Sequence, residues 1–235
     1  MNILLISGFM ASNSLWDDVV SDFASIGAVT YADLSEGNSI SEMAAKALIS
    51  APDKFVAVGF SMGGYIAREM ARMASHRTSG LVLIATSARS DTPEQAAAKA
   101  MAVNQLQVSQ FAGLSRTTVK QSLSLKNAEN AAMVDRVRQM SIDLGRDAFI
   151  RQALLRRQGD GDRLGEIHCP TLVIAAAEDR LRSRDEAEEL AAGMKNAQLV
   201  FIPKSGHMLP IEAPHALIDV VVPWLTLRRD QHARL

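Results

Sequence analysis

The chain has 235 residues, of which 48% are hydrophobic and 22% are charged, and its formal net charge is -1. That length and composition suit one hydrophobic core, so we expect a globular protein. A near-neutral chain without a run of five like charges offers no basic surface for nucleic acid or an anionic membrane, and we predict neither as a partner.

Three features bear on where the protein is found. The single cysteine, Cys169, cannot form an internal disulfide, which is compatible with a reducing compartment. The opening residues "MNILLISGFM" lack a basic region and a long apolar run of the kind found in secretory signals. No stretch approaches the roughly 20 apolar residues needed to cross a bilayer. We therefore expect a cytoplasmic protein.

Six short apolar runs rich in β-branched residues recur along the chain. They cover residues 3–6, 29–31, 55–58, 81–85, 172–175 and 199–202. Continuous rather than alternating apolarity is typical of strands that are buried on both faces, and helical patterns lie between several of the runs. The sequence therefore predicts an α/β fold, with a mostly parallel sheet flanked by helices.

This alternation stops between about residues 90 and 165, where helical patterns replace strands. The first pattern opens with Asp91 as a candidate N-cap, Pro93 in the first turn and Glu94 close behind. Two more follow at 127–145 and 146–159. We predict that residues 89–165 form a helical cap, or lid, inserted into a core made of residues 1–88 and 166–235.

The stretch "VGFSMGGYIA" places Ser61 between Gly59 and Gly63, where a predicted strand ends and a helix begins. On a sharp strand-to-helix turn, side chains at the two flanking positions would collide with neighbouring elements, and glycine removes that collision. The hydroxyl would then lie above the carboxyl end of the sheet, beside a helix N-terminus that favours negative charge. The alternative interpretation is a glycine-rich turn that merely joins strand and helix.

A reactive serine needs a base, and the base needs a group that fixes its tautomer. Of the five histidines, His207 in "VFIPKSGHMLPIEAP" is the one that follows the last strand-like run, at the same sheet edge as Ser61. A solvated loop histidine is the alternative. "LVIAAAEDRLRS" places Glu178 and Asp179 directly after a strand; Asp179 is the first choice and Glu178 the fallback. A carboxylate there also commonly caps the next helix.

With Ser61, Asp179 and His207 in this order, the sequence resembles the α/β-hydrolase superfamily, especially its small, cap-bearing, serine esterase-like members. The likeness covers nearly the whole chain and is weakest in the cap; "GFSMGG", "PTLVIAAAEDRL" and "SGHMLPIEAP" carry it. It implies a sheet of about six strands, because the family's usual leading pair is missing, and the exposed edge this leaves would allow a homodimer. The chain departs from the family at Ser7, usually histidine, and at Ala176, usually glycine.

The resemblance also implies an oxyanion hole. In that comparison "LLISGFM" supplies the backbone N–H of Phe9, and Met62, directly after the serine, supplies the second N–H. Removing one such donor from an enzyme typically costs about 3 kcal/mol of transition-state stabilisation. For this role, the direction of each amide N–H matters more than the identity of the side chain.

For the substrate pocket we expect apolar residues of the cap, with one tryptophan near the oxyanion loop, so that the acyl side is mainly apolar. Packing of the cap onto the body is the alternative role for the same residues. The candidates are Trp16, Met101, Phe111, Met133, Met140 and Phe149. A late group of arginines could receive an acidic substrate, a coenzyme A moiety or an acyl-carrier protein, or form a solvated face. Its members are Arg151, Arg156, Arg157 and Arg163.

The predicted function is a serine hydrolase that cleaves a carboxylic ester of a small, mainly apolar molecule through an acyl-enzyme. The same triad could act on a thioester or hydrolyse a carbon–carbon bond of a diketone, and a ligand-binding protein without turnover is the non-enzymatic alternative. The histidines lack the spacing of metal ligands, and neither a phosphate loop nor a dinucleotide motif is present. We therefore expect no metal and no cofactor.

Overall fold

The computed structural model describes residues 1–106 and 110–232. Its centre is a six-stranded sheet in the order β2-β1-β3-β4-β5-β6, and every neighbouring pair is parallel. Each predicted apolar run overlaps one strand, so the α/β prediction is confirmed. The strands are β1 (Asn2–Ile6), β2 (Ala28–Tyr31), β3 (Phe55–Phe60), β4 (Thr78–Ile84), β5 (Thr171–Ala176) and β6 (Ala197–Ile202).

The apolar runs explain the position of each strand in the sheet. β3 and β5 are buried at every residue, whereas the edge strand β2 has no buried residue. Successive side chains of a strand point to opposite faces, so Ile3 and Leu5 of β1 enter one core cluster while Leu4 and Ile6 enter another. The sheet therefore separates two hydrophobic cores.

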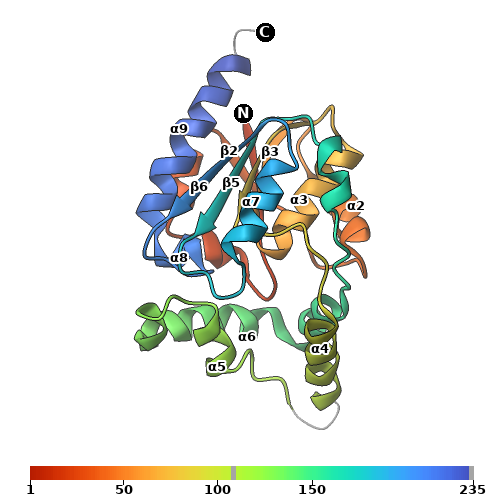
Figure 1. Ribbon diagram of the computed structural model, residues 1–235, viewed down its shortest axis with the longest axis vertical. Helices are drawn as coiled ribbons and strands as arrows, with labels where there is room; N and C mark the ends of the chain where they lie inside the picture. The colour runs from red at the N-terminus through yellow and green to blue at the C-terminus, as the bar shows by residue number, and fades with distance from the viewer. Residues whose placement is uncertain (107–109, 233–235) are drawn as a thin grey trace.

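Helices cover both faces of the sheet (Figure 1). α1 (Val20–Ala24) and α9 (Pro214–His232) pack on the face that holds Ile3. α2 (Ile40–Ser50), α3 (Met62–Met73) and α7 (Arg184–Ala192) pack on the opposite face. A short helix, α8 (Leu209–Glu212), leads into α9. None of the helices among the described residues is long and apolar enough to cross a membrane.

Among its described residues, the segment between β4 and β5 consists of helices joined by loops. α4 (Pro93–Gln105), α5 (Arg116–Gln121) and α6 (Ala131–Leu154) lie across the carboxyl ends of the strands (Figure 1). We call these three helices the cap. Residues 107–109 of the predicted cap lie outside the described part of the chain, and the division at residues 89 and 165 stays a prediction.

One detail of the cap differs from the sequence prediction, and a second agrees with it. The N-cap of α4 is Thr92, not Asp91: the Thr92 hydroxyl accepts a hydrogen bond from Gln95 N, and the Gln95 side chain accepts one from Thr92 N. Asp91 binds the cations of Lys99 and Arg157 instead. The two helices predicted at 127–145 and 146–159 correspond to the two parts of α6, which begin at Ala131, meet at the predicted boundary at Gly145, and end at Leu154; Gly145 has a non-helical φ of 78° and ψ of -177°.

Candidate active site

Ser61 makes the turn between β3 and α3 by itself. It has φ 52° and ψ -113°, a backbone conformation that residues other than glycine rarely adopt. A Cβ on Gly59 would lie 2.5 Å from the carbonyl oxygen of Gly63, and a Cβ on Gly63 would overlap the carbonyl oxygen of Ile6. The collision predicted from the sequence is therefore present at both glycines, and only glycine permits this turn.

Hydrogen bonds with the end of β4, with the loop that follows β4 and with α3 hold the strained residue. Ser61 N donates to Ile84 O of β4 at 2.9 Å, and the Thr86 hydroxyl donates to Ser61 O at 2.7 Å. Gly64 N donates to the same carbonyl at 3.0 Å. Such a conformation persists only where its surroundings fix it, and these three bonds do so.

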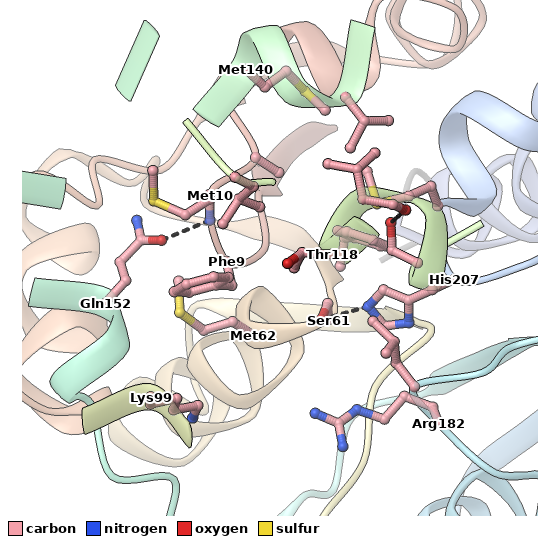
Figure 2. A pocket seen from close by; sticks show the side chains of 18 of the residues that line it. Phe9, Met10, Ser61, Met62, Lys99, Thr118, Met140, Gln152, Arg182 and His207 are labelled. Carbon is pink, nitrogen blue, oxygen red and sulfur yellow. Dashed lines mark hydrogen bonds between the residues drawn. The ribbon is translucent and has the colours of Figure 1, made fainter. Parts of the chain in front are cut away.

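The ends of three strands bring Ser61, Asp179 and His207 together. His207 Nε2 lies 2.9 Å from Ser61 Oγ, and His207 Nδ1 lies 2.8 Å from Asp179 Oδ2. Figure 2 shows the imidazole pointing at the serine. His207 is 5% exposed and Ser61 is 8% exposed, so the chain of hydrogen bonds is largely shielded from water.

The loop after β5 orients the carboxylate. Asp179 Oδ1 accepts hydrogen bonds from Leu181 N at 2.8 Å and Arg182 N at 2.9 Å, which leaves Oδ2 for His207. Glu178, the fallback from the sequence, is exposed and makes no hydrogen bond to His207. A carboxylate on Nδ1 fixes the tautomer with a lone pair on Nε2, so His207 can take a proton from Ser61.

Two backbone amides flank the same cavity. Phe9 and Met62 line it together with Ser61. Phe9 N donates no hydrogen bond to another described residue, and Met62 is the first residue of α3, where an N–H has no partner within the helix. Both predicted oxyanion donors therefore have a free amide beside Ser61.

The loop that carries Phe9 is tied to the rest of the protein on both sides. Met10 has a left-handed φ of 51°, and its amide donates to Gln152 Oε1 of α6 at 2.8 Å. Ser7, which stands where the family usually has histidine, accepts a hydrogen bond from Trp16 Nε1 at 3.0 Å. The small hydroxyl thus makes room for an indole that anchors this loop.

A cavity of about 330 Å³ opens above Ser61. Of the six residues predicted to line it, Met140 does so. Trp16 is fully buried in the body of the protein, where it binds Ser7, and Met101 is 63% exposed on α4. Neither residue lines the cavity. Trp16 was predicted from its nearness to the oxyanion loop, but its side chain points into the core; Met101 was predicted from helical spacing, which does not tell which face of a helix meets the cavity.

The other three predicted lining residues pack elsewhere. Phe149 stacks against Phe9 and Phe111, with ring centroids 5.8 Å and 5.2 Å apart, so it lies behind the wall that Phe9 forms. Met133 packs against the core cluster on the sheet face that holds Ile3. For these residues the alternative weighed from the sequence, packing of the cap onto the body, is the one found.

The cavity also has polar lining residues that the sequence analysis missed. Arg157 alone of the four predicted arginines lines it; Arg156 and Arg163 border a separate polar hollow, and Arg151 a third. Arg182 could have been found from the sequence as a lining residue, because it lies three residues after Asp179 on the same turn. The residues missed are Gln95, Lys99, Thr118, Ser122, Gln152 and Arg182.

A second cluster of buried charges lies away from Ser61. Arg68 is fully buried and forms a two-pronged ion pair with Asp160, from Nε at 2.9 Å and from Nη2 at 2.8 Å. Arg72 Nη2 adds a third bond at 2.9 Å. Burial acts to raise the pKa of Asp160, but the bonds and charges of Arg68 and Arg72 outweigh it and hold the pKa below its usual range.

Neither metal ligation nor a reactive thiol accompanies the site. Within residues 1–106 and 110–232, no three side chains of His, Cys, Asp or Glu are grouped so as to hold a metal ion. Burial raises the pKa of the Cys169 thiol to about 11, which keeps it protonated at neutral pH.

Comparisons with known proteins identify the family and the fold. The family model described as alpha/beta hydrolase fold matches residues 48–214. "Putative carbamate hydrolase RutD" of Rhizobium rhizogenes is 26% identical over 249 residues, which is 97% of this chain and 94% of that protein.

Two solved structures share the fold. A thermophilic esterase from Thermogutta terrifontis, with malate bound, superposes with a TM-score of 0.85 at 23% identity and covers 97% of this chain and 90% of its own. The enol-lactonase from Burkholderia xenovorans LB400 gives a TM-score of 0.85 at 19% identity, over 96% of this chain and 91% of its own. The chain belongs to the α/β-hydrolase fold family and is a hydrolase-type enzyme.

Proposed function

We propose that the protein is a serine hydrolase that cleaves the carboxylic ester of a small, mainly apolar molecule through an acyl-enzyme. The observation that carries this proposal is the continuous hydrogen-bonded series from Asp179 through His207 to Ser61, which ends at a cavity. A buried, correctly oriented imidazole next to a hydroxyl is the arrangement that activates serine as a nucleophile.

In the first half of the reaction, Ser61 Oγ attacks the ester carbonyl and its proton passes to His207 Nε2. The negative oxygen that forms would accept hydrogen bonds from the Phe9 and Met62 amides, and Asp179 stabilises the imidazolium. His207 then gives its proton to the departing alkoxide. The alcohol leaves, and the acyl group stays on Ser61.

Water completes the second half by the same route. His207 takes a proton from a water molecule as the water oxygen attacks the acyl carbon. The tetrahedral intermediate collapses, the acid is released, and the proton returns from His207 to Ser61 Oγ. The strained backbone at Ser61 keeps Oγ in one place for both steps, which is what an attack along a fixed direction requires.

Lining residues of the cavity support a small, mainly apolar substrate. Beside Met140, the apolar ones include Phe9, Met10, Leu114, Val119, Val137 and Met208. Methionine side chains are flexible and adapt to different shapes. A cavity of about 330 Å³ lies at the lower end of the usual range for small-molecule sites.

The test is a panel of p-nitrophenyl butyrate, a butyryl thioester and an aryl diketone with the same butyryl group, together with a p-nitrophenyl carbamate of similar size, assayed with product analysis. Ester turnover should be highest, and Ser61→Ala should lower it about 10⁴-fold or more. Ser205→Ala is the matched control, because the hydroxyl of this buried serine of the histidine loop donates to Ile202 O and the residue does not line the cavity.

Three outcomes would overturn the proposal. Faster cleavage of the thioester, carbamate or diketone would move the reaction to that bond. Ester turnover that survives Ser61→Ala would remove the proposed nucleophile. Tight binding of the panel without any product would identify a ligand-binding protein.

A further inference from the structure

The cavity has two chemically different ends. Met10 and Met140 line one end, and Lys99 and Arg182 line the other (Figure 2). Arg157, which also lines the cavity, shares the carboxylate of Asp91 with Lys99. In Figure 2, Lys99 and Arg182 lie on the opposite side of Ser61 from Met140. A substrate whose carbonyl is placed at Ser61 would therefore extend toward apolar side chains in one direction and toward cations in the other.

Carboxylates do not face the cavity at this cationic end. Among the described residues that line it, three are cationic and none is acidic. The nearest partner, Asp91, lies behind the cations and is shared by two of them: Lys99 Nζ is 2.7 Å from its Oδ2, and Arg157 Nε is 2.6 Å from its Oδ1. One carboxylate thus serves two cations, and their positive charge is only partly balanced.

Arg182 is held in place but has few partners. Its backbone N–H is fixed by Asp179, and its Nη1 donates to Glu186 Oε1 at 3.3 Å. The other oxygen of Glu186 accepts a hydrogen bond from Ser183 N at 2.7 Å. Arg182 Nε is buried without any hydrogen-bond partner. Because Arg182 lines the cavity and its hydrogen bond to the Glu186 carboxylate is long, an anion in the cavity would give this guanidinium a second partner.

Lys99 experiences the same imbalance. Burial lowers its pKa, and the charges of Arg157 and Arg182 act in the same direction, against the hydrogen bond that Lys99 donates to Asp91 and the charge of that carboxylate. The ammonium group is therefore in an environment where further positive charge is unfavourable. An anion placed between these cations would relieve the repulsion among all three.

We infer that the cationic end binds a carboxylate of the substrate, so that the preferred ester carries an apolar group on one side of its carbonyl and a carboxylate on the other. This inference rests on the proposed function for the position of the ester at Ser61. A guanidinium presents parallel N–H donors that match the two oxygens of a carboxylate, and the lysine beside it adds charge.

Two matched pairs of substrates test the inference. p-Nitrophenyl valerate and the p-nitrophenyl monoester of glutaric acid differ by a carboxylate on the acyl chain. Phenyl butyrate and 4-carboxyphenyl butyrate differ by a carboxylate on the leaving group. In one of these pairs, the carboxylate should raise kcat/KM about tenfold, mainly through KM, since one charge-assisted hydrogen bond contributes this much.

Variants locate the preference. Arg182→Gln should abolish the ratio of anionic to neutral kcat/KM, Arg182→Lys should retain most of it because the charge remains, and Lys99→Gln should reduce it. Arg184→Gln is the matched control, because this exposed arginine two residues along pairs with Glu188 and does not line the cavity. Absence of a carboxylate preference in both pairs, or a ratio unchanged by Arg182→Gln, would overturn the inference.

A binding measurement separates this inference from the proposed function. The Ser61→Ala variant is titrated calorimetrically with monomethyl glutarate and with methyl valerate, in the presence and absence of Arg182→Gln. We expect the anion to bind at least about tenfold more tightly than the neutral ester only when Arg182 is present. Equal binding of both would overturn the inference, whereas absent ester turnover by the wild type would count against the proposed function alone.

Discussion

Two buried carboxylates, Asp160 and Asp179, make opposite uses of their surroundings. Their side chains are 11% and 2% exposed, and both accept several hydrogen bonds. Asp160 is bound by the guanidinium groups of Arg68 and Arg72, which keep their protons. Asp179 is bound by the imidazole of His207, which can give up or accept a proton.

The difference shows that burial and charge alone do not identify a catalytic carboxylate. The Arg68–Asp160–Arg72 cluster joins α3 to the segment that leads from the cap into β5, so its expected role is to hold these parts together. The Asp179 series ends at a hydroxyl beside a cavity, so its expected role is chemistry. Substituting each carboxylate by its amide tests the contrast with the same chemical change.

The largest effect is expected for Asp179→Asn. The amide oxygen can keep the bonds from Leu181 N and Arg182 N, so the NH₂ group faces His207 Nδ1 and forces the proton onto Nε2. His207 then cannot accept the proton of Ser61, and ester turnover should fall about 10⁴-fold. The midpoint of urea unfolding should change little, with a loss below about 1 kcal/mol. Retained turnover would mean that Asp179 does not set the tautomer.

Asp160→Asn should give the reverse pattern. Removing one partner of a buried ion pair leaves Arg68 and Arg72 uncompensated and should cost about 3–5 kcal/mol of unfolding free energy. Turnover per folded molecule should stay within about threefold, because Asp160 does not line the cavity above Ser61. Urea unfolding followed by circular dichroism, together with the ester assay, measures both quantities.

The stability difference between wild type and Asp160→Asn should also depend on pH. Because the pKa of Asp160 is lowered in the folded protein, its stabilisation is complete above the unfolded value of about 3.9 and is lost as the pH falls through the folded value. The difference in unfolding free energy between wild type and Asp160→Asn should therefore be large at neutral pH and shrink in acid. A difference that grows in acid would contradict the assignment.

A smaller effect is expected for Gly63→Ala, which disturbs the turn that presents Ser61. The added methyl overlaps the carbonyl oxygens of Ile6 and Ser7, so α3 or β1 must shift. We expect a loss of about 1–3 kcal/mol in stability and about 10² in turnover. Gly161→Ala is the matched control, because nothing lies within 4 Å of a Cβ at that position. Equal behaviour of the two variants would show that the turn tolerates a side chain.

The smallest effect concerns Cys169, a nucleophilic side chain that has neither a base nor a cation as its partner. Its pKa of about 11 leaves about one thiol in a thousand ionised at pH 8. Alkylation by iodoacetamide should be far slower in the folded protein than in urea, and it should not change ester turnover. Rapid alkylation of the folded protein with loss of activity would place a reactive thiol near the site.

Local sequence rules predicted the sheet and the three converging residues. Gly59 and Gly63 flank the serine in the sequence, so the sharp turn was recognisable locally, although the carbonyl that a side chain at Gly63 would meet belongs to β1. The positions of Asp179 and His207 follow from the rule that parallel strands end at one edge of the sheet. Each of these predictions rests on a residue's place at the end of a strand and needs no knowledge of side-chain packing.

The lining of the cavity could not be predicted in the same way. Lys99 and Met101 lie two residues apart on α4, yet Lys99 lines the cavity while Met101 faces solvent. The outcome depends on how α4 is rotated against the body, which is decided by tertiary contacts such as the pair between Lys99 and Asp91. From its apolar side chain, Met101 was the residue expected to line the cavity. The ion pair with Asp91 instead directs Lys99 toward the cavity.

Labelling with a fluorophosphonate, followed by peptide mapping in the mass spectrometer, tests whether His207 makes Ser61 reactive. We expect one label per wild-type chain, on the peptide that contains Ser61, with no label in Ser61→Ala and labelling slowed by several orders of magnitude in His207→Ala. A label on another residue, or labelling of His207→Ala at the wild-type rate, would contradict the proposal that His207 activates Ser61.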